Sequence, residues 1–558
     1  MNQFRQMFRC KGRLIQGVIW LLLLTAACQG VEKPPGTGMV ATTAAATLSS
    51  TGAAGESNAE QAVGGTLVMA LDSEPATLDP HKTTDGRLFG FTGATLVTQD
   101  PHGGYAPYLA ESWTTSPDGL IWDFKLRPGI TFYDGTPLDA ATYAWTFQRW
   151  LDPQTASPTA PAAIASVEAV GNLTLRLVLH EPYYSLLDKL SAGFAEPLSP
   201  EAVERAGNAY GRNPLGVGPY ILQEWISGEK IVLKRNPDFK WAPSFAGNPG
   251  PAYIETIEIR IMPEYATVVA ALEVGEVDFY YLIQPQDIEH LEEAGVIIQR
   301  SLAAGMEPFI AMNLSRPVFQ DIRVRQALNL AVDRESLIKV AAPGTAVPQY
   351  GPLSPTVSGY WPGVEQIGYS YDLQRARELM AAAGWSLNSD GLLEKDGRPF
   401  EMTLNFIPWN GHDVVAQVLQ QQLGELGIDV ALAQQEFGSF IATGSAGDYD
   451  LALSFYLAPE FDVVYRFFHS NNLGAANISQ LADPRLDAIL DRTRRETDAA
   501  RRQAAADEAQ RYIVEQAYVV PLFTREIAQA WNKRVQDVIF VPPGGFWLFD
   551  ATLAGEDR

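Results

Sequence analysis

The stretch LAESWTTSPDGLIWDFKLRPGITFYDGTP, residues 109–137, decides the fold because a β-hairpin can be followed in it residue by residue. Residues 116–119 are Ser-Pro-Asp-Gly, with proline early and glycine late, as a β-turn requires. Beyond this turn Trp122, Phe124 and Leu126 alternate with charged residues, and this period of two predicts a strand with one buried face. The stretch therefore predicts two extended segments joined by a tight turn.

Strand and helix patterns alternate along the rest of the chain. Such long alternation is typical of an α/β protein. A strand at 309–313 leads into a helix that carries Ala327, Leu328 and Ala331 on one face. The helix predicted at 138–150 has apolar positions at Ala141, Trp145 and Phe147. Further short extended segments are expected at 66–70, 130–133, 172–179, 230–234, 254–261, 402–406, 427–432 and 449–455, and further helical segments at 265–272, 372–384, 414–426 and 487–516.

One of these helices has ends that can be recognised in the sequence. Asp372 can accept a hydrogen bond from the first turn, and Gly384 can end the helix in the left-handed conformation. Leu373, Ala376 and Met380 make the apolar stripe between them. The spacing predicts a surface helix that packs along this stripe.

Read as a whole, residues 109–137 resemble the signature of the extracellular solute-binding proteins of the peptide/nickel type, family 5. These proteins are the external receptors of ABC importers. The resemblance extends over roughly residues 66–550. It is carried by further segments, which are LDSEPATLDP at 71–80, NPLGVGPY at 213–220, RNPDF at 235–239, GEVDF at 275–279, FQDIRVRQAL at 319–328, AVDRE at 331–335, YDL at 371–373 and VVPLF at 519–523.

The resemblance implies an α/β, two-lobed periplasmic-binding-protein fold, type II-like, with an extra subdomain on lobe I and a ligand cleft between the lobes. We therefore expect residues 65–300 to form lobe I, including the extra subdomain at about 101–212. Residues 301–520 would form lobe II, and residues 521–558 would return to lobe I. In similar proteins a hinge motion of the lobes encloses the ligand.

The N-terminus has the composition of a bacterial signal peptide. Four basic residues and no acidic residue precede an apolar run at 15–24. Small residues follow this run and lead to Cys28. Residues 1–27 are therefore predicted to be a signal peptide, too short for a stable membrane span. A cysteine after small residues resembles a lipobox, which implies that Cys28 carries a lipid anchor. Cys10 and Cys28 are the only cysteines, so no disulfide is expected in the mature body.

Residues 28–64 are expected to be a flexible linker between the lipidated cysteine and the folded body. Alanine, threonine, glycine and serine dominate this segment, and it has few bulky apolar residues to bury. The predicted location is extracytoplasmic, at the bacterial cell membrane, on the periplasmic or the cell surface. The membrane would be contacted through the lipid anchor only.

Composition excludes some classes of partner. The formal charge is -24, and removal of the four basic residues of the signal segment leaves about -28. A nucleic-acid-binding role would need a basic surface, so no nucleic acid is expected. Strong acidity favours solubility and self-repulsion, and the protein is expected to be a monomer.

No motif for catalysis or for a cofactor is present. The sequence lacks the Ser-centred hydrolase motif, the zinc-protease motif and the glycine-rich phosphate and dinucleotide loops. The six histidines are scattered and none is paired at metal-ligand spacing. We therefore expect no catalytic residue, no metal and no cofactor, and no enzyme activity. Because acidic residues are abundant, a secreted hydrolase on a similar scaffold stays open as the alternative.

Two segments are candidates for contact with a ligand, NFIPWNGHD at 405–413 and LSFYLAPEFDVVYRFF at 453–468. In similar peptide receptors the second region supplies a tryptophan that packs on the ligand and an aspartate that pairs with the α-ammonium group of a peptide. The corresponding positions here are Leu453 and Tyr456. Glu460 or Asp462 would replace the missing acid if the loop is reshaped.

The predicted ligand-binding residues follow from these segments and from the loop after the first strand. An aromatic cleft suits sugars or apolar amines, and a peptide with a charged N-terminus would lack its counter-charge at position 456. We therefore expect unmodified peptides to bind more weakly than neutral solutes. The residues are Trp409, Phe455, Tyr456, Phe461, Asp462, Leu78 and Thr84.

The sequence thus predicts a substrate-binding lipoprotein of an ABC importer. It would capture a small solute, oligopeptide-like, oligosaccharide or other, by lobe closure. It would then deliver the solute to a membrane permease and its ATPase subunits.

Overall fold

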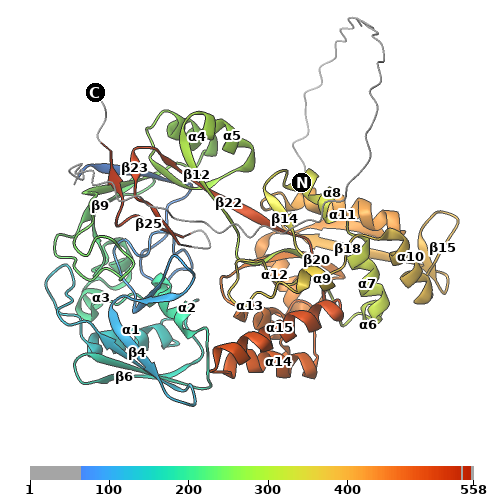
Figure 1. The fold of residues 1–558 in the computed structure, drawn as a ribbon, viewed down its shortest axis with the longest axis horizontal. Helices are drawn as coiled ribbons and strands as arrows, with labels where there is room; N and C mark the ends of the chain where they lie inside the picture. The colour runs from blue at the N-terminus through green and yellow to red at the C-terminus, as the bar shows by residue number, and fades with distance from the viewer. Residues whose placement is uncertain (1–63, 542–544, 555–558) are drawn as a thin grey trace, which may run out of the picture. The chain divides into compact units, whose positions relative to one another are not determined.

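The computed structural model describes residues 64–541 and 545–554. The predicted signal peptide, Cys28 and the predicted linker up to residue 63 lie outside these residues. Within the part of the chain that is described, no helix combines the length and the apolar character that a membrane span requires. The described chain is mixed α/β, and its larger sheets have eight, five and four strands (Figure 1).

The eight-stranded sheet is built around the first strand of the body. β1 pairs in parallel with β10 and β11, whereas the pairs farther out are antiparallel. The predicted strands at 66–70, 230–234 and 254–261 are therefore confirmed as β1, β9 and β10. In spatial order the sheet contains β12 (Val296–Leu302), β22 (Phe523–Asn532), β11 (Phe279–Ile283), β1 (Thr66–Leu71), β10 (Thr256–Ile261), β9 (Lys230–Arg235) and β8 (Tyr220–Ile226), and β14 (Ala346–Pro348) pairs with β22.

The hairpin predicted from residues 109–137 is confirmed. Its two strands pair antiparallel around the predicted turn, in which Gly119 has a φ of +73°. Trp122, Phe124 and Leu126 are buried, and the residues between them are half-buried or exposed. Two more strands extend the hairpin into a four-stranded antiparallel sheet with the order β4 (Ala110–Thr115), β5 (Ile121–Leu126), β7 (Thr174–Leu179) and β6 (Ile164–Val170).

The extended run expected at 130–133 is reduced to an isolated bridge between Thr131 and Pro137. The helix after it, α1 (Ala140–Leu151), begins with a cap in which the Asp139 carboxylate accepts a hydrogen bond from the backbone N–H of Thr142 at 2.8 Å. Residues 130–137 are thus held as a loop between the hairpin and this cap.

The buried face of α1 differs from the apolar positions that the sequence suggested. Tyr143, Phe147 and Trp150 are buried, at spacings of four and three residues, while Ala141 is exposed. Helical periodicity places residues three or four positions apart on the same face. Ala141 and Phe147 are six positions apart, so they cannot both lie on the face that packs. The bulky aromatic residues therefore decide which face packs.

The five-stranded sheet contains the predicted strand–helix–strand unit of residues 402–432. β18 and β19 pair in parallel, and α11 (His412–Leu426) connects them. Gly427, with a φ of +103°, ends this helix in the left-handed conformation. The spatial order is β19 (Asp429–Gln434), β18 (Glu401–Phe406), β20 (Leu451–Leu457), β13 (Gly305–Met312) and β21 (Val519–Pro521).

The helix predicted at 372–384 is confirmed as α10 (Leu373–Ala382). The Asp372 carboxylate accepts a hydrogen bond from the backbone N–H of Arg375 at 2.8 Å. Ala376 and Met380 are buried, and Gly384 follows the helix with a φ of +89°.

The helical region expected at 487–516 is two helices, α14 (Pro484–Arg495) and α15 (Ala499–Glu515). The chain is extended at Glu496, and Asp498 starts the second helix by accepting a hydrogen bond from the backbone N–H of Arg501 at 2.9 Å. An N-capping aspartate inside a charge-rich run is therefore the local reason for the break.

The remaining strands form small groups beside these sheets. They are β2 (Val97–Gln99) with β3 (Tyr105–Pro107), β15 (Ser386–Leu387) with β16 (Leu393–Lys395) and β17 (Arg398–Pro399), β23 (Val535–Gln536) with β26 (Thr552–Leu553), and β24 (Ile539–Val541) with β25 (Gly545–Trp547).

The remaining helices are α2 (Leu186–Ser191), α3 (Pro200–Ala206), α4 (Tyr265–Glu273), α5 (Ile288–Glu293), α6 (Pro317–Gln320), α7 (Ile322–Ala331), α8 (Arg334–Ala341), α9 (Val364–Ile367), α12 (Phe437–Ala446) and α13 (Asp462–Phe468). Short 3-10 helices lie at Gly193–Ala195, Gly207–Arg212, Pro285–Asp287 and Ser470–Asn472.

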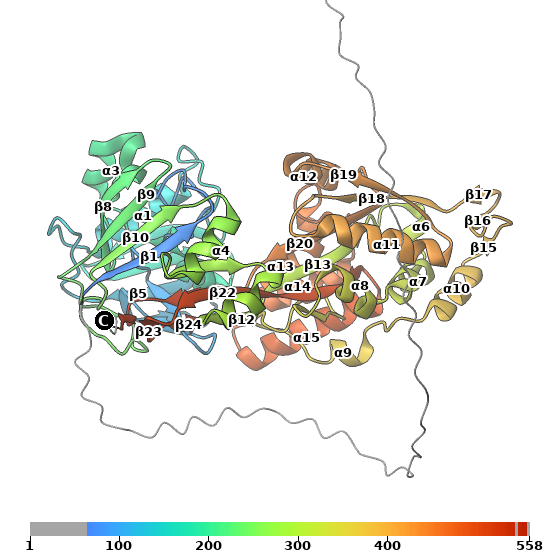
Figure 2. The same ribbon diagram turned by 90° about the horizontal axis from the view of Figure 1, so that it is seen from above.

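Apart from the short strand β14, which pairs with the start of β22, the chain passes between the eight-stranded and five-stranded sheets where β12 is followed by β13 and where β21 is followed by β22. β22 itself pairs with β12 and β11 along most of its length and with β14 at its start. Figure 2 shows β12 beside β22. These two connecting segments are the places where a hinge between the sheets would have to bend.

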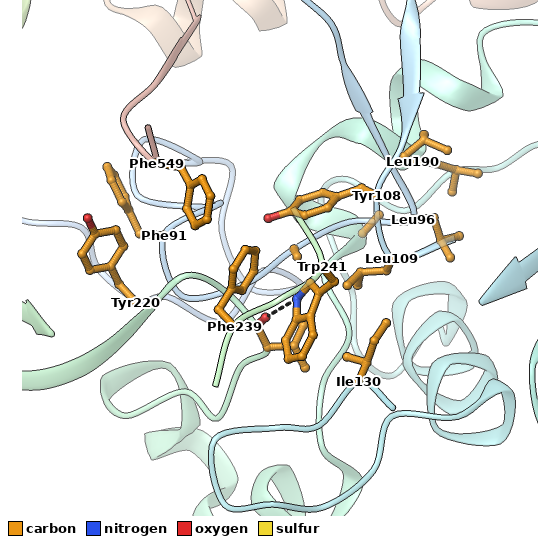
Figure 3. Close-up of a cluster of buried hydrophobic side chains, with 14 of the residues drawn as sticks. Phe91, Leu96, Tyr108, Leu109, Ile130, Leu190, Tyr220, Phe239, Trp241 and Phe549 are labelled. Carbon is orange, nitrogen blue, oxygen red and sulfur yellow. Dashed lines mark hydrogen bonds between the residues drawn. The ribbon is translucent and has the colours of Figure 1, made fainter. Parts of the chain in front are cut away.

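A core of aromatic side chains joins two of the family-like segments (Figure 3). The Phe239 ring lies 5.1 Å from Trp241 and 5.0 Å from Phe549, and the Trp241 indole N–H donates to the carbonyl of Val217 at 3.0 Å. Phe239 belongs to RNPDF and Val217 to NPLGVGPY. The two segments thus meet at one packed core with a residue from near the end of the chain.

The arginines of the family-like helix segments also serve the fold. Arg325 donates to the carbonyls of Phe319 at 2.7 Å and Gln516 at 2.9 Å. Arg334, which is buried, donates to the carbonyl of Pro521 at 2.8 Å, and burial lowers its pKa to about 10. Both guanidinium groups therefore tie backbone segments together inside the protein.

Candidate ligand pocket

A large pocket in the described part of the chain has a volume of about 800 Å³. Small-molecule sites commonly occupy about 300–1,000 Å³. Its walls come from two distant parts of the sequence. The first wall includes Thr84, Trp150, residues 158–163 and residues between His180 and Phe194, and the second includes residues 456–460, Arg466 and Arg494.

The loop after β1 supports the first wall. The Asp79 carboxylate accepts two hydrogen bonds from the Arg149 guanidinium, at 3.0 and 2.7 Å, and Arg149 also donates to Nδ1 of His81 at 2.8 Å. The His81 ring stacks on Trp150 at 5.6 Å, and burial together with Arg149 lowers the pKa of His81 to about 3. The LDP segment and His81 thus support Trp150, which lines the pocket together with Thr84.

Helix α2 brings two charged groups to the same wall. Asp188 accepts a hydrogen bond from the Tyr105 hydroxyl, and burial, followed by the charge of Glu460, raises its pKa to about 7. Lys189 reaches across the pocket, where its Nζ lies 3.1 Å from Oε1 of Glu460. Glu460 precedes α13, so this ion pair joins the two walls.

The second wall is formed by the end of β20 and by α13. The Arg466 guanidinium lies 4.7 Å from the centre of the Tyr456 ring, and the centre of the Phe467 ring lies 5.4 Å from that of Tyr456. An arginine over an aromatic face is attracted to it and loses part of its freedom. Arg466 is therefore held at the pocket wall.

A smaller pocket of about 220 Å³ adjoins the same walls and shares Asp188, Glu460 and Arg494 with the larger one. Asp462 lines it, but its carboxylate already accepts two hydrogen bonds from Arg494, at 2.6 and 2.9 Å, and one from the Tyr183 hydroxyl at 3.2 Å. The charge of Asp462 is therefore compensated within the protein.

Further contacts join the two walls at the rim of the pockets. Glu181 forms an ion pair with Arg495 at 3.1 Å, and the Arg502 guanidinium lies 3.0 Å from the Tyr184 ring centre. A Cβ placed on Gly119 would lie 3.2 Å from a methyl carbon of Thr497, which puts the hairpin turn against the α14–α15 connection.

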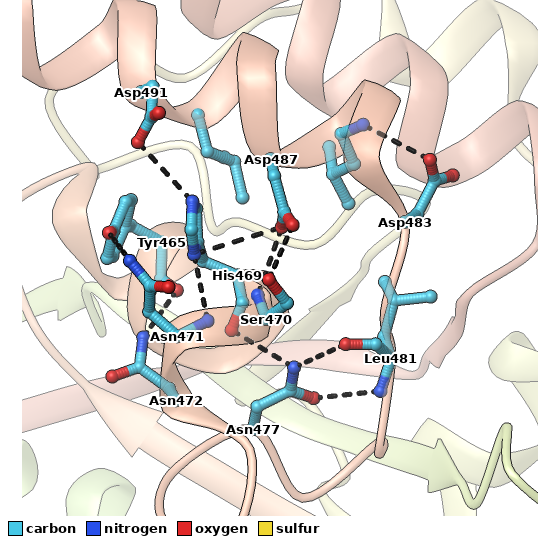
Figure 4. Close-up of polar contacts among 12 residues, drawn as sticks. Tyr465, His469, Ser470, Asn471, Asn472, Asn477, Leu481, Asp483, Asp487 and Asp491 are labelled. Atoms are coloured by element: carbon cyan, nitrogen blue, oxygen red, sulfur yellow. Dashed lines mark hydrogen bonds and ion pairs between the residues drawn. The ribbon is translucent and has the colours of Figure 1, made fainter.

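A polar network holds the turn after α13 against α14 (Figure 4). The Asp487 carboxylate accepts hydrogen bonds from the backbone N–H of Ser470 at 3.0 Å and from its hydroxyl. Nε2 of His469 lies 3.3 Å from the carboxylate of Asp491, while its Nδ1 accepts from the backbone N–H of Asn471 at 3.0 Å. The network fixes α13 on α14, and these helices carry Arg466 and Arg494.

The structure places the predicted ligand-binding residues in several different surroundings. Thr84 and Tyr456 line the large pocket, and Phe461 and Asp462 line the small one. Leu78 is buried in the hydrophobic core and lines neither pocket.

Trp409 and Phe455 stack on each other at 4.2 Å and line neither of these two pockets. Arg525 lies beside Trp409, with its guanidinium 5.5 Å from a ring centre, and pairs with the buried Glu307 at 3.2 Å. Glu307 lies in β13, after the first connection between the sheets, and Arg525 lies in β22, after the second. Trp409 thus lies beside an ion pair that links β13 to β22.

Sequence reasoning missed Asp188, Lys189 and Arg466. In the sequence, Asp188 and Lys189 form an ordinary charged pair within LLDKLS, where a solvated helix face would look the same. Lys189 and Glu460 are 271 residues apart in the chain, so no local pattern could have joined them.

The fold and the pocket define a two-lobed α/β binding protein. The model of the bacterial extracellular solute-binding proteins, family 5 (middle region), matches residues 104–475, and the chain belongs to this family. The predicted fold class and family are thereby confirmed.

Similar proteins cover nearly the whole body. The glutathione-binding protein GsiB of Escherichia coli is 28% identical over 526 residues, which is 87% of this chain and 94% of that protein. HbpA2 from Haemophilus parasuis has a TM-score of 0.78 at 23% identity and covers 88% of this chain and 100% of its own. NikA from Brucella suis, in complex with Fe(III)-EDTA, has a TM-score of 0.75 at 27% identity and covers 87% and 99%.

Proposed function

We propose that this protein is the substrate-binding component of an ABC importer. It captures a small solute in the large pocket by closure of its two lobes and delivers it to a membrane permease that works with ATPase subunits. The observation that carries the proposal is the pocket of about 800 Å³ with walls from two distant parts of the chain. A ligand that contacts both walls favours the closed arrangement by its differential affinity.

The relatives support a solute with carboxylate groups. GsiB is named for glutathione binding, and the NikA structure contains Fe(III)-EDTA. Glutathione and EDTA differ in size and in metal content, but both carry carboxylates. The proposed solute is therefore a small polar molecule with at least one carboxylate group.

We further propose that lobe I consists of residues 65–300 and 521–558, with the extra subdomain at about 101–212, and that lobe II consists of residues 301–520. The ion pair of Lys189 with Glu460 and the other contacts between the two walls would hold the closed arrangement. The connecting segments near β13 and β22 would act as the hinge.

Solute capture can be tested on the purified mature protein. We expect mass spectrometry of the denatured protein to release one small solute in near-stoichiometric amount after incubation with an extract of bacterial small molecules. Saturation with that solute should reduce the radius of gyration in small-angle scattering. Failure to retain any solute, or an unchanged scattering profile at saturation, would contradict the proposal.

The proposed role includes no catalysis. A secreted hydrolase on the same scaffold would release a chemically altered product, whereas a receptor returns its solute intact. The released solute is therefore compared with the solute that was added, and a stoichiometric excess of cleaved product over many turnovers would favour the hydrolase.

We also propose that the protein is a monomer attached to the outer face of the cell membrane through Cys28. The support is the basic and apolar N-terminal segment with Cys28 after small residues. A Cys28→Ser variant is expected to leave the membrane fraction and appear in the soluble extracytoplasmic fraction, measured by cell fractionation. A Cys10→Ser variant, as the control, should stay with the membrane. Membrane retention of Cys28→Ser would overturn the anchor, and size-exclusion chromatography with light scattering checks the monomer.

A further inference from the structure

The two walls of the large pocket contact each other directly through pairs of opposite charge. Lys189 of the first wall lies 3.1 Å from Glu460 of the second. At the rim, Glu181 lies 3.1 Å from Arg495. The carboxylate of Asp462 is held by an arginine of its own wall. Each of these three carboxylates therefore keeps a cation where the walls meet.

Asp188 differs from these three carboxylates. It lines both pockets, and its carboxylate accepts a hydrogen bond from the Tyr105 hydroxyl. Among the described residues it forms no ion pair, and the neighbouring Lys189 is engaged by Glu460. Glu460 and Asp462 add two negative charges from the other wall. Where the walls meet, Asp188 therefore lies close to acids without a cation of its own.

We propose that closure of the two walls takes up one proton at Asp188, so that acidity favours the closed arrangement and a rise in pH favours opening. The inference goes beyond solute capture, but it rests on the proposed function because it concerns the same closure. The protein would hold its closed form more firmly in acidic than in neutral surroundings. No contact between the solute and Asp188 is required for this effect.

The direction of the effect follows from the cost of enclosing a charge. A carboxylate that is withdrawn from water without a cation is destabilised, and the like charges of the opposite wall add to this cost. A protonated carboxyl group carries no charge, and it can still take part in a hydrogen bond with Tyr105. The closed arrangement therefore binds the proton more tightly than an open one, in which water would reach Asp188.

The linkage between pH and closure has a defined sign. In the closed arrangement burial, followed by the charge of Glu460, raises the pKa of Asp188 to about 7. Opening returns this pKa toward the value of about 3.9 for a solvated aspartate. Between the two values the closed arrangement carries the proton and the open one does not, so closing takes it up. Lowering the pH from 7.5 to 5.5 should therefore raise the ratio of closed to open molecules about tenfold or more.

Other charged and titratable groups face Asp188 from both walls, so its own contribution must be separated from theirs. The Asp188→Asn variant makes this separation, because the amide is neutral at every pH and resembles the protonated carboxyl group in shape. The groups are Tyr105 of β3, Tyr184 before α2, Lys189 of α2, Glu460 and Asp462 at the start of α13, Arg494 of α14 and Arg502 of α15.

The test is a zero-length cross-link between Lys189 and Glu460, whose side chains belong to opposite walls. The purified mature protein is freed of co-purified solute by unfolding and refolding. It is then treated with a carbodiimide at pH 5.5 and at pH 7.5, and the amide link is quantified by mass spectrometry. Each yield is divided by the yield of Asp188→Asn at the same pH, which cancels the pH dependence of the reagent.

We expect this quotient to be near one at pH 5.5 and about threefold or more lower at pH 7.5, because the yield follows the closed fraction. Small-angle scattering gives a second readout. The radius of gyration of the unchanged protein should be smaller at pH 5.5 than at pH 7.5, and that of Asp188→Asn should be the same at both.

Two further variants sharpen the scattering experiment. Asp390 is an exposed acid that lines neither pocket, so Asp390→Asn should keep the pH dependence of the unchanged protein. Glu460→Gln removes the facing charge and frees Lys189 to pair with Asp188. The pH at which the molecule opens should therefore move to a lower value in this variant.

The outcomes separate proton uptake from solute capture. A quotient that is equal at the two pH values, or a pH-dependent radius of gyration that persists in Asp188→Asn, would overturn proton uptake at Asp188. Expansion on acidification would overturn its direction. Each of these results leaves solute capture standing, since that function fails only when the protein retains no solute from the bacterial extract or does not compact at saturation.

Discussion

Replacement of Asp278 by alanine is expected to lower the free energy of unfolding by about 3–5 kcal/mol, since it breaks a buried ion pair and removes one acceptor from each of its two partners. Asp278 is fully buried. Its carboxylate accepts hydrogen bonds from the Arg534 guanidinium and from the backbone N–H of Val68 at 2.8 Å. It therefore links β1 to the segment after β22.

The measurement is urea unfolding at pH 7, followed by circular dichroism. Glu276→Ala is the matched control, because Glu276 lies two residues away on the surface and its carboxylate has no partner among the described residues. The control should stay within about 0.5 kcal/mol of the unchanged protein. An Asp278→Ala variant with the same midpoint as the control would show that the buried pair contributes nothing.

Gly218→Ala is expected to destabilise the protein by about 2–3 kcal/mol, because a side chain at this position overpacks the interior. A Cβ on Gly218 would lie 2.5 Å from the carbonyl carbon of Thr92 and 2.6 Å from backbone atoms of Phe91 and Gly93. These neighbours are backbone atoms, so no rotation of a side chain can relieve the overlap. The loop of residues 91–93 must move instead.

Gly424→Ala is the control for this substitution. Gly424 lies in α11 and is exposed, and a Cβ placed on it would have no heavy atom of another residue packed within 4 Å. Alanine has the higher helix propensity, and the control is expected to gain up to about 1 kcal/mol. Thermal unfolding of both variants should therefore shift in opposite directions. A Gly218→Ala protein that unfolds at the unchanged temperature would contradict the close approach of the two loops.

The sequence alone determined the elements whose signals are local. The hairpin of residues 109–137 and the helix that begins after Asp372 both depend on neighbours within a few positions, and both form as predicted. The parallel unit of β18, α11 and β19 could be predicted because the hydrophobic pattern of the sequence changes from that of a strand to that of a helix and back again. The family resemblance also predicted the two-lobed fold, and two of its segments meet at the packed core of Phe239 and Trp241.

Local signals were insufficient where tertiary packing determined which of several apolar residues is buried. The sequence offered Ala141 and Phe147 as apolar positions of one helix, and only contact with the core decided that Phe147 is buried and Ala141 is exposed. The aromatic pair of Trp409 and Phe455 had the composition of a ligand site, but the tertiary structure places it over the pair of Arg525 and Glu307.

The charges of the pocket depended on the tertiary structure alone. Asp462 and Glu460 were equal candidates for a free acid in the sequence, but Arg494 and Lys189 neutralise them in the folded protein. Among the described residues Asp188 forms no ion pair, although α2 brings it to the pocket next to Lys189. A sequence pattern reports which residues are buried along one element, whereas the pairing of charges across two walls depends on how distant segments meet.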